Sequence, residues 1–189
     1  MKIEIHKDED HVLEFTLKDA TTAFANGIRR CCMGQVPTFA IQKVTIYENT
    51  SAMFDEYVTN RLGMIPLKSE SKHTDKDEIM FTLDAEGPCT VTSKDLKSSD
   101  SKIKVANQNL PIMKLLDKQK LRLEATAILG KGRVHGKFQP GIASYKMDKS
   151  GAFKFKVESF GQLNAKHIVL QATRILEEKC EELEKLLKE

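Results

Sequence analysis

The sequence predicts an α+β protein in which a mostly β domain is inserted into a domain formed by the two chain ends. Near the N-terminus, apolar and polar residues alternate on both sides of the acidic turn at 8–10, which is typical of a β-hairpin. Amphipathic helices are expected directly after this hairpin and over residues 164–189. Short strands and turns fill the stretch 79–147 between them. An insertion explains this order with one discontinuous domain.

The first helix is expected to begin near Ala20 and to end before Pro37, because proline cannot continue a helix. Asp19 precedes it and suits a cap, since its carboxylate can accept hydrogen bonds from the first free backbone N–H groups. Helical spacing places Arg29 and Arg30 on the polar face. The apolar face carries Ala20, Phe24, Gly27, Ile28, Cys31 and Cys32.

A strand is expected over residues 38–48, but its apolar phase shifts at positions 42–43. A regular strand cannot change faces, so the shift predicts a bulge or a bend. A short helix follows, which Gly63 is placed to stop. A charged loop is expected over 69–78. The apolar spacing of the short helix comes from Phe54, Tyr57, Val58, Arg61 and Leu62.

Residues 121–129 alternate clearly and predict a strand, followed by a turn at 130–132; residues 153–157 predict another strand. The last helix, over 164–189, would be about 38 Å long at 1.5 Å per residue. Such a helix is long for a chain of 189 residues, so we expect part of its apolar face to contact another chain. Its apolar stripe consists of Val169, Ala172, Leu176, Cys180, Leu183 and Leu187.

Composition indicates a highly charged globular protein, with 40% hydrophobic and 30% charged residues. The formal net charge of +3 is too small to argue for nucleic-acid binding by itself. The four cysteines show no C-x-x-C spacing, and we expect them to be reduced thiols of a cytoplasmic protein. The polar N-terminus and the lack of a long apolar run predict neither a signal peptide nor a membrane span.

Neither a Ser-His-Asp nor an H-E-x-x-H pattern occurs, so no catalytic, cofactor-binding or metal-binding residue is predicted. The glycine-rich basic stretch 130–137 is the best candidate for a phosphate cradle, because glycines let backbone N–H groups face an anion. No helix is expected after it, however, so a turn with a basic surface loop is the favoured interpretation. A nucleic-acid-binding module that uses the basic 131–137 loop stays open as an alternative function.

Several stretches together resemble one family, the alpha-like subunits of DNA-directed RNA polymerases, and within it the archaeal branch. The similarity covers nearly the whole chain. The matching stretches are 24–30 (FANGIRR), 35–41 (QVPTFAI), 44–49 (VTIYEN), 55–67 (DEYVTNRLGMIPL) and 127–140 (AILGKGRVHGKFQP).

The resemblance implies a fold and a role. The fold would be a discontinuous alpha-like dimerisation domain, residues 1–42 and 151–189, with an inserted mostly-β domain over 43–150. The role would be that of a non-catalytic assembly subunit. It would pair with small subunit L and, joined by subunits N and P, form the platform for the large catalytic subunits. DNA would be contacted only indirectly, within the complex.

The resemblance also assigns candidate interface residues. Those expected at the partner interface are Phe24, Asn26, Ile28, Arg29, Arg30, Ile168, Val169, Ala172, Leu176 and Leu183. Those expected to face a large subunit are Arg61, Lys131, Arg133, His135 and Lys137.

Two departures from the family pattern carry expectations of their own. Gly27 stands where the family usually has alanine, and could permit closer helix packing at a cost of roughly 1 kcal/mol of helix propensity. Many archaeal relatives carry a cysteine-rich insertion with iron–sulfur clusters, each of which needs four suitably spaced thiolates. Between residues 87 and 110 this chain has only Cys89, so it is expected to bind no cluster.

Overall fold

The computed structural model describes residues 1–69 and 77–188, so most of the charged loop expected over 69–78 lies outside the described residues. The chain divides into two compact units. The first unit consists of residues 1–37 and 131–189, and the second consists of residues 38–130. The second unit is thus an insertion within the first.

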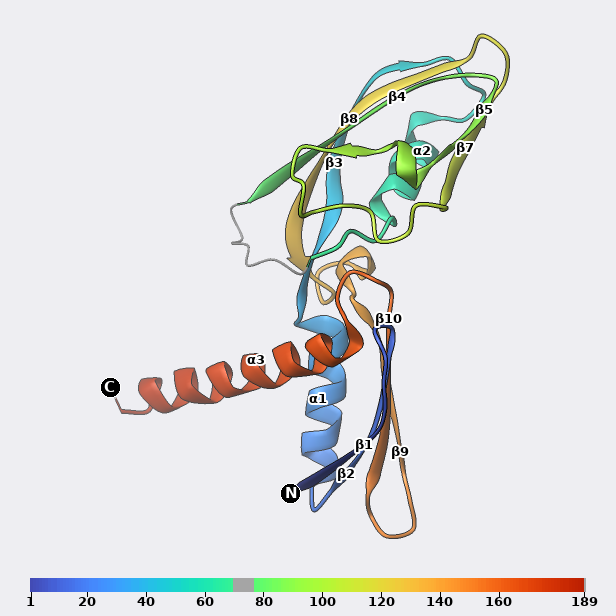
Figure 1. Cartoon of the computed structure of the whole chain (residues 1–189). Helices are drawn as coiled ribbons and strands as arrows, with labels where there is room; N and C mark the ends of the chain where they lie inside the picture. Colours follow the sequence, from blue (N-terminus) through green and yellow to red (C-terminus); the bar gives the residue numbers. More distant parts are fainter. Residues whose placement is uncertain (70–76, 189) are drawn as a thin grey trace. The chain divides into compact units, whose positions relative to one another are not determined.

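The first unit is built on an antiparallel sheet whose strand order is β1-β2-β10-β9 (Figure 1). The predicted N-terminal hairpin is confirmed, with Ile3 opposite Leu17 and Ile5 opposite Phe15. Phe15 also stacks on Phe155 of the neighbouring strand at a ring-centroid distance of 4.8 Å. The four strands are β1 (Lys2–Asp8), β2 (Val12–Lys18), β9 (Gly141–Met147) and β10 (Phe153–Ser159).

Helix α1 (Thr22–Gly34) follows the hairpin, as predicted, but its cap is Thr21 and not Asp19. The Thr21 hydroxyl accepts a hydrogen bond from the Phe24 N–H at 3.2 Å. Asp19 lies in the left-handed region, with φ of 56°, and forms part of the turn that leads into the helix. The expected Asp19 cap was therefore wrong, because this turn places Thr21, the first of two adjacent threonines, at the capping position.

Helix α3 (Ala165–Leu186) confirms the long C-terminal helix, and Asn164 caps it by accepting a hydrogen bond from Lys166 N–H at 2.9 Å. It packs on α1, β10 and β2. The buried side chains of both helices and of the sheet form one hydrophobic core.

The second unit contains a sheet of order β3-β8-β4-β6, a two-stranded ribbon β5-β7 and helix α2 (Asp55–Gly63). The predicted strand over 121–129 is confirmed as part of β8. The strands are β3 (Pro37–Asn49), β4 (Glu78–Glu86), β5 (Cys89–Thr92), β6 (Lys97–Ser98), β7 (Pro111–Leu115) and β8 (Lys120–Lys131).

The phase shift expected in β3 is present, because Phe39 and Ile41 are buried, Gln42 and Lys43 are exposed, and burial resumes partly at Val44. Strand β8 runs through Gly130 and Lys131, so the expected turn begins later, at Gly132.

The limits of the units differ from the expected domain limits of 42/43 and 150/151. Strand β9 pairs along its whole length with β10, from Gly141 opposite Ser159 to Met147 opposite Phe153. It therefore belongs to the sheet of the first unit, and the inserted unit ends near residue 130.

Candidate subunit interface

Helix α1 offers a partly polar surface to its surroundings. Ile28 is buried in the core, whereas Phe24 and Arg30 are exposed. The Arg29 guanidinium is held within the helix, where its Nε and Nη2 donate to Asn26 Oδ1 at 3.1 and 3.0 Å. Arg30 is the arginine of this pair that is available to an external group.

Helix α3 is covered by its own unit over its first half alone (Figure 1). Ile168 and Ala172 are buried, while Val169 and Leu176 are half-buried. From residue 177 to residue 188 every side chain is exposed, and Leu183 has 58% of its surface accessible. Leu186 and Leu187 are exposed as well, so the second half of α3 presents an uncovered apolar surface.

The loop after β8 is fastened to the C-terminal end of α1. The backbone N–H of Arg133 donates to the Gly34 carbonyl at 2.9 Å. A Cβ added at Gly132 would lie 2.2 Å from the Met33 carbonyl oxygen, so the close approach requires glycine. This contact fixes the position of the Arg133 backbone, from which the side chain extends.

Further along this loop, a short 3-10 helix covers Gly136–Phe138. His135 caps it by accepting from the Lys137 N–H at 3.1 Å. The Lys137 ammonium lies 5.2 Å from the Phe138 ring centroid, and partial burial lowers the pKa of Lys137. Lys131 and His135 are exposed.

A pocket of about 500 Å³ lies between α1, α3 and this loop, and we name it the cationic pocket. Arg30, Arg133 and Lys179 line it, and no acidic residue does so within the described chain. In residues 1–69 and 77–188 none of these three cations forms an ion pair. Unpaired cations that converge favour an anionic group. The structure thus brings Arg30 and Leu176, expected at the partner interface, together with Arg133, expected to face a large subunit.

The cysteines are free thiols. Cys31 borders the cationic pocket and its Sγ donates to the Ala172 carbonyl at 3.3 Å. Burial raises the pKa of the Cys31 thiol, and nearby Lys179 and Lys131 offset part of that rise. Burial raises the pKa of Cys32 to about 12. Both thiols are therefore protonated near neutral pH and make poor nucleophiles.

Cys180 is exposed on α3, and Cys89 is half-buried in the second unit. Among the described residues, no group of three or more His, Cys, Asp or Glu side chains is arranged to hold a metal ion. Within the same residues, no helix is both long enough and apolar enough to cross a membrane.

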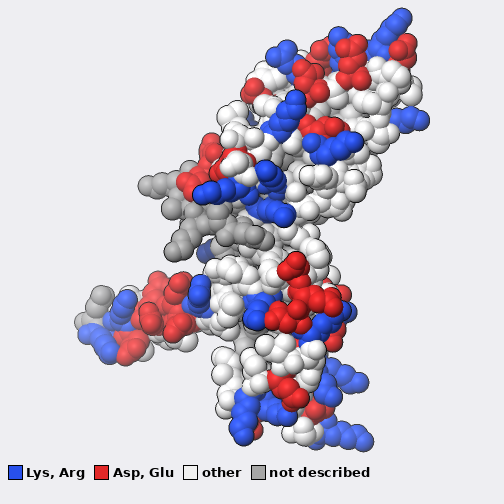
Figure 2. Space-filling model, viewed as in Figure 1, with Lys and Arg blue, Asp and Glu red and all other residues white. Residues whose placement is uncertain are grey.

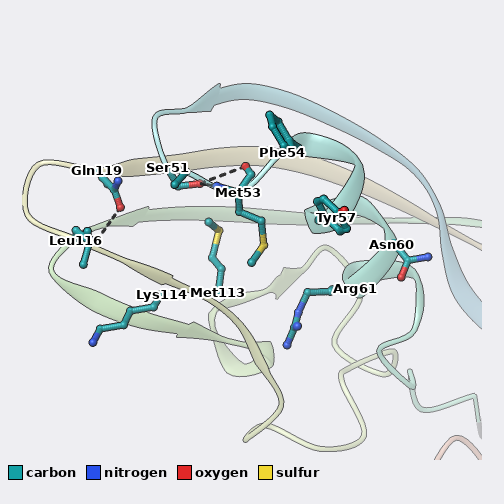
Figure 3. A pocket seen from close by; sticks show the side chains of 11 residues that line it. Ser51, Met53, Phe54, Tyr57, Asn60, Arg61, Met113, Lys114, Leu116 and Gln119 are labelled. Atoms are coloured by element: carbon teal, nitrogen blue, oxygen red, sulfur yellow. Dashed lines mark hydrogen bonds between the residues drawn. The ribbon is translucent and has the colours of Figure 1, made fainter.

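Arg61 is the candidate that belongs to the second unit, where it borders a groove of about 810 Å³ (Figure 3). Its Nη2 donates to the Pro111 carbonyl at 2.6 Å. We name this feature the methionine groove, because Met53 and Met113 extend toward one another at its centre. Its other principal lining residues are Phe54, Tyr57, Lys114 and Leu116.

The groove was missed from the sequence because the apolar face of α2 was assigned too broadly. Val58 and Leu62 are buried, as that interpretation requires, but Phe54 and Tyr57 have 69% and 64% of their surfaces exposed. The sequence carried no signal for the groove, because positions 54, 57, 58 and 62 follow the i, i+3, i+4, i+8 spacing that is typical of one buried stripe. Lys179 was also missed as a site residue, because the spacing of residues in the sequence does not indicate that α3 packs on α1 at this point.

Charge of both signs is mixed over the surface in the view of Figure 2. In the sequence of the second half of α3, Glu181 and Glu182 lie between Lys179 and Lys185. Such mixing gives little long-range attraction for a polyanion.

Comparisons with known proteins agree with the motifs. Residues 41–142 match the family model of the RNA polymerase Rpb3/RpoA insert domain. The chain is 47% identical over 167 residues to the DNA-directed RNA polymerase subunit Rpo3 of Methanocaldococcus jannaschii, an alignment that covers 88% of this chain and 85% of that relative.

More distant relatives carry the same name. Rpo3 of Pyrococcus furiosus is 42% identical over 77% of this chain, and Rpo3 of Halobacterium salinarum is 43% identical over 75% of it. The alignments cover 59% and 57% of those relatives, which are therefore longer than the region they share with this chain.

Proposed function

Because this chain belongs to the alpha-like family of RNA polymerase subunits, which contain the Rpb3/RpoA insert domain, we propose that it pairs with small subunit L to form an assembly platform. The resemblance found in the motifs is confirmed by the insert-domain match and by the Rpo3 relatives. The chain is an assembly subunit of a DNA-directed RNA polymerase.

The uncovered second half of α3 is the observation that carries the pairing. A helix of 22 residues that leaves its last turns exposed, with leucines among them, has apolar surface that a partner helix would bury. We place the interface on Phe24 and Arg30 of α1 and on Leu183 of α3, with Val169 and Leu176 at its edge. Ile28, Ile168 and Ala172 would support the interface residues without contacting the partner, because their own unit already buries them.

The exposed loop after β8 is assigned to a large subunit. Lys131, Arg133 and His135 are accessible there, and the Gly34–Arg133 hydrogen bond holds the loop in place. Subunits N and P would complete the platform in the cytoplasm, and the large subunits would carry catalysis, with no catalytic residue supplied by this chain.

The alternative of a nucleic-acid-binding module at 131–137 has less support, because Lys137 is half-buried and its ammonium lies against the Phe138 ring.

We further propose that the chain holds no iron–sulfur cluster. Cys31 and Cys32 are buried in the core of the first unit, so only Cys89 and Cys180 are even partly accessible, whereas a cluster needs four thiolates. Iron and acid-labile sulfide in stoichiometric amounts in protein purified without oxygen would contradict this.

The pairing is tested by co-expressing the chain with a subunit L and measuring mass by light scattering in high salt. A stable 1:1 heterodimer is expected, because an apolar helix contact resists salt screening. Leu183→Glu should abolish it. Met147→Glu is the matched control, since Met147 is similarly exposed, at 56%, but lies on β9. A chain that stays monomeric beside subunit L would overturn the proposal.

A further inference from the structure

The methionine groove of the second unit is an open apolar surface that the pairing proposed above does not use. Phe54, Tyr57 and Leu116 stand exposed around it, and Met113 forms its buried floor. The two aromatic rings lie 6.3 Å apart and within 30° of parallel. Exposed aromatic side chains that cluster beside methionines in this way are typical of protein contact surfaces.

The walls of the groove are held in place by hydrogen bonds. On one side, Asn49 Nδ2 donates to the Met53 carbonyl at 2.9 Å and to Asp55 Oδ1 at 2.7 Å. The Ser51 hydroxyl accepts from the Met53 N–H at 3.2 Å. These contacts fix the segment that presents Met53 and Phe54.

The opposite wall is equally constrained. The Leu116 N–H donates to Gln119 Oε1 at 2.7 Å, and the Arg61 guanidinium bridges α2 to β7 through the Pro111 carbonyl. A groove that is already formed costs little conformational entropy when a ligand enters it.

The charges along the groove have one sign. Arg61 and Lys114 are exposed, and within the described chain no acidic residue lines the groove. The acidic groups nearest in sequence are Asp55, which is engaged by Asn49, together with Glu56 and Asp117, and none of the three is a lining residue. Arg61 uses one N–H on Pro111 and keeps donors for an incoming carboxylate.

We propose that the methionine groove is a docking site for an acidic segment of another polypeptide. An apolar side chain of that segment packs between Met53, Tyr57 and Met113, and a neighbouring carboxylate pairs with Arg61 and Lys114. Methionine adapts to the shape of the inserted side chain, and the cations select for acidic flanks. The volume of about 810 Å³ is ample for one large side chain and its neighbours.

The test uses the full chain, labelled with ¹³C at the methionine methyl groups, and a short synthetic peptide with a Leu-Phe pair flanked by Asp and Glu. A matched peptide carries Lys in place of the acidic residues. We expect saturable shifts of the Met53 and Met113 signals with the acidic peptide, while Met1 and Met147 of the first unit stay unchanged. The basic peptide should bind at least about tenfold more weakly.

Variants separate the charge from the apolar contact. Arg61→Glu with Lys114→Glu should weaken acidic-peptide binding about tenfold or more, and Tyr57→Ser should weaken both peptides. Lys97→Glu with Lys102→Glu is the control, because these exposed lysines lie in the same unit but do not line the groove. Circular dichroism checks that each variant is folded.

Three outcomes would overturn the proposal. The first is the lack of a saturable shift at Met53 and Met113, and the second is equal affinity for both peptides. The third is a wild-type chain that self-associates and loses this self-association when Tyr57→Ser is introduced. The last would assign the groove to a second copy, whose acidic, leucine-containing α3 end has similar chemistry. Light scattering of the free chain distinguishes that case, and none of these results depends on whether subunit L binds.

Discussion

The backbone N–H of Arg133 lies 2.9 Å from the carbonyl oxygen of Gly34 and donates a hydrogen bond to it. This bond joins the start of the loop after β8 to the C-terminal end of α1, about one hundred residues earlier in the chain. It explains why two groups of candidate residues, assigned to different partners from the sequence, line one pocket. The contact also makes Gly132, the residue before Arg133, sensitive to substitution.

Replacing Gly132 with alanine should destabilise the first unit by about 1–3 kcal/mol, because the new Cβ would lie 2.2 Å from the Met33 carbonyl oxygen. Urea unfolding measures this loss. Gly136→Ala is the matched control, since a Cβ there meets no atom within 4 Å. Equal stability of the two variants would show that the loop does not approach α1 so closely.

Replacing Gly27 with alanine should stabilise the free chain by roughly 0.5–1 kcal/mol, because alanine is the better helix former. A Cβ at Gly27 would meet no described atom within 4 Å, so no helix within residues 1–69 and 77–188 packs closely against this position. Thermal unfolding of the free chain gives the expected rise. If Gly27 allows close packing, it does so with a partner, and the same variant would then weaken the heterodimer.

The free energy of unfolding should fall as pH rises from about 9 toward 12, in part because of Cys32. Burial raises the pKa of this thiol from 9.0 to about 12, so between these values the unfolded chain loses a proton that the folded chain keeps. The contribution approaches about 1.4 kcal/mol per pH unit within that window and is absent below it. Comparing the pH slope of the wild type with that of Cys32→Ala isolates it, and identical slopes would contradict the burial of Cys32.

Two substitutions in α3 should differ sharply in the free chain. Ile168→Ala should cost about 2–4 kcal/mol of stability, because it removes a buried side chain from the core of the first unit. Leu183→Ala should change stability by less than about 0.5 kcal/mol, because Leu183 is exposed. Denaturant unfolding of the free chain measures both, and a large loss for Leu183→Ala would mean that the helix end is covered.

Much of the secondary structure followed from side-chain periodicity. The hairpin with Ile5 opposite Phe15, the strand around Leu123 and the helix that buries Val58 were all predicted, because period two and period three to four report directly which side chains face a core. The helix cap at Thr21 was predicted wrongly as Asp19, since several neighbouring residues could have served and only the turn geometry selects among them.

The candidate sites depended more on long-range packing. Arg30 and Arg133 were identified as candidates, but their convergence with Lys179 requires α1, α3 and the loop to pack together. Ile168 and Ala172 were expected at the partner interface, and their own core buries them. Phe54 and Tyr57 looked like core residues because hydrophobicity alone does not say which apolar side chains remain outside.

The sequence by itself determined the family, the order of elements and the two-part arrangement with an insertion, because these depend on motifs and on local periodicity. The tertiary structure decided that β9 belongs to the sheet of the first unit, that the second half of α3 stays uncovered and that a cationic pocket and a methionine groove exist. Each of these depends on contacts between residues far apart in the chain, and local side-chain patterns carry no information about such contacts.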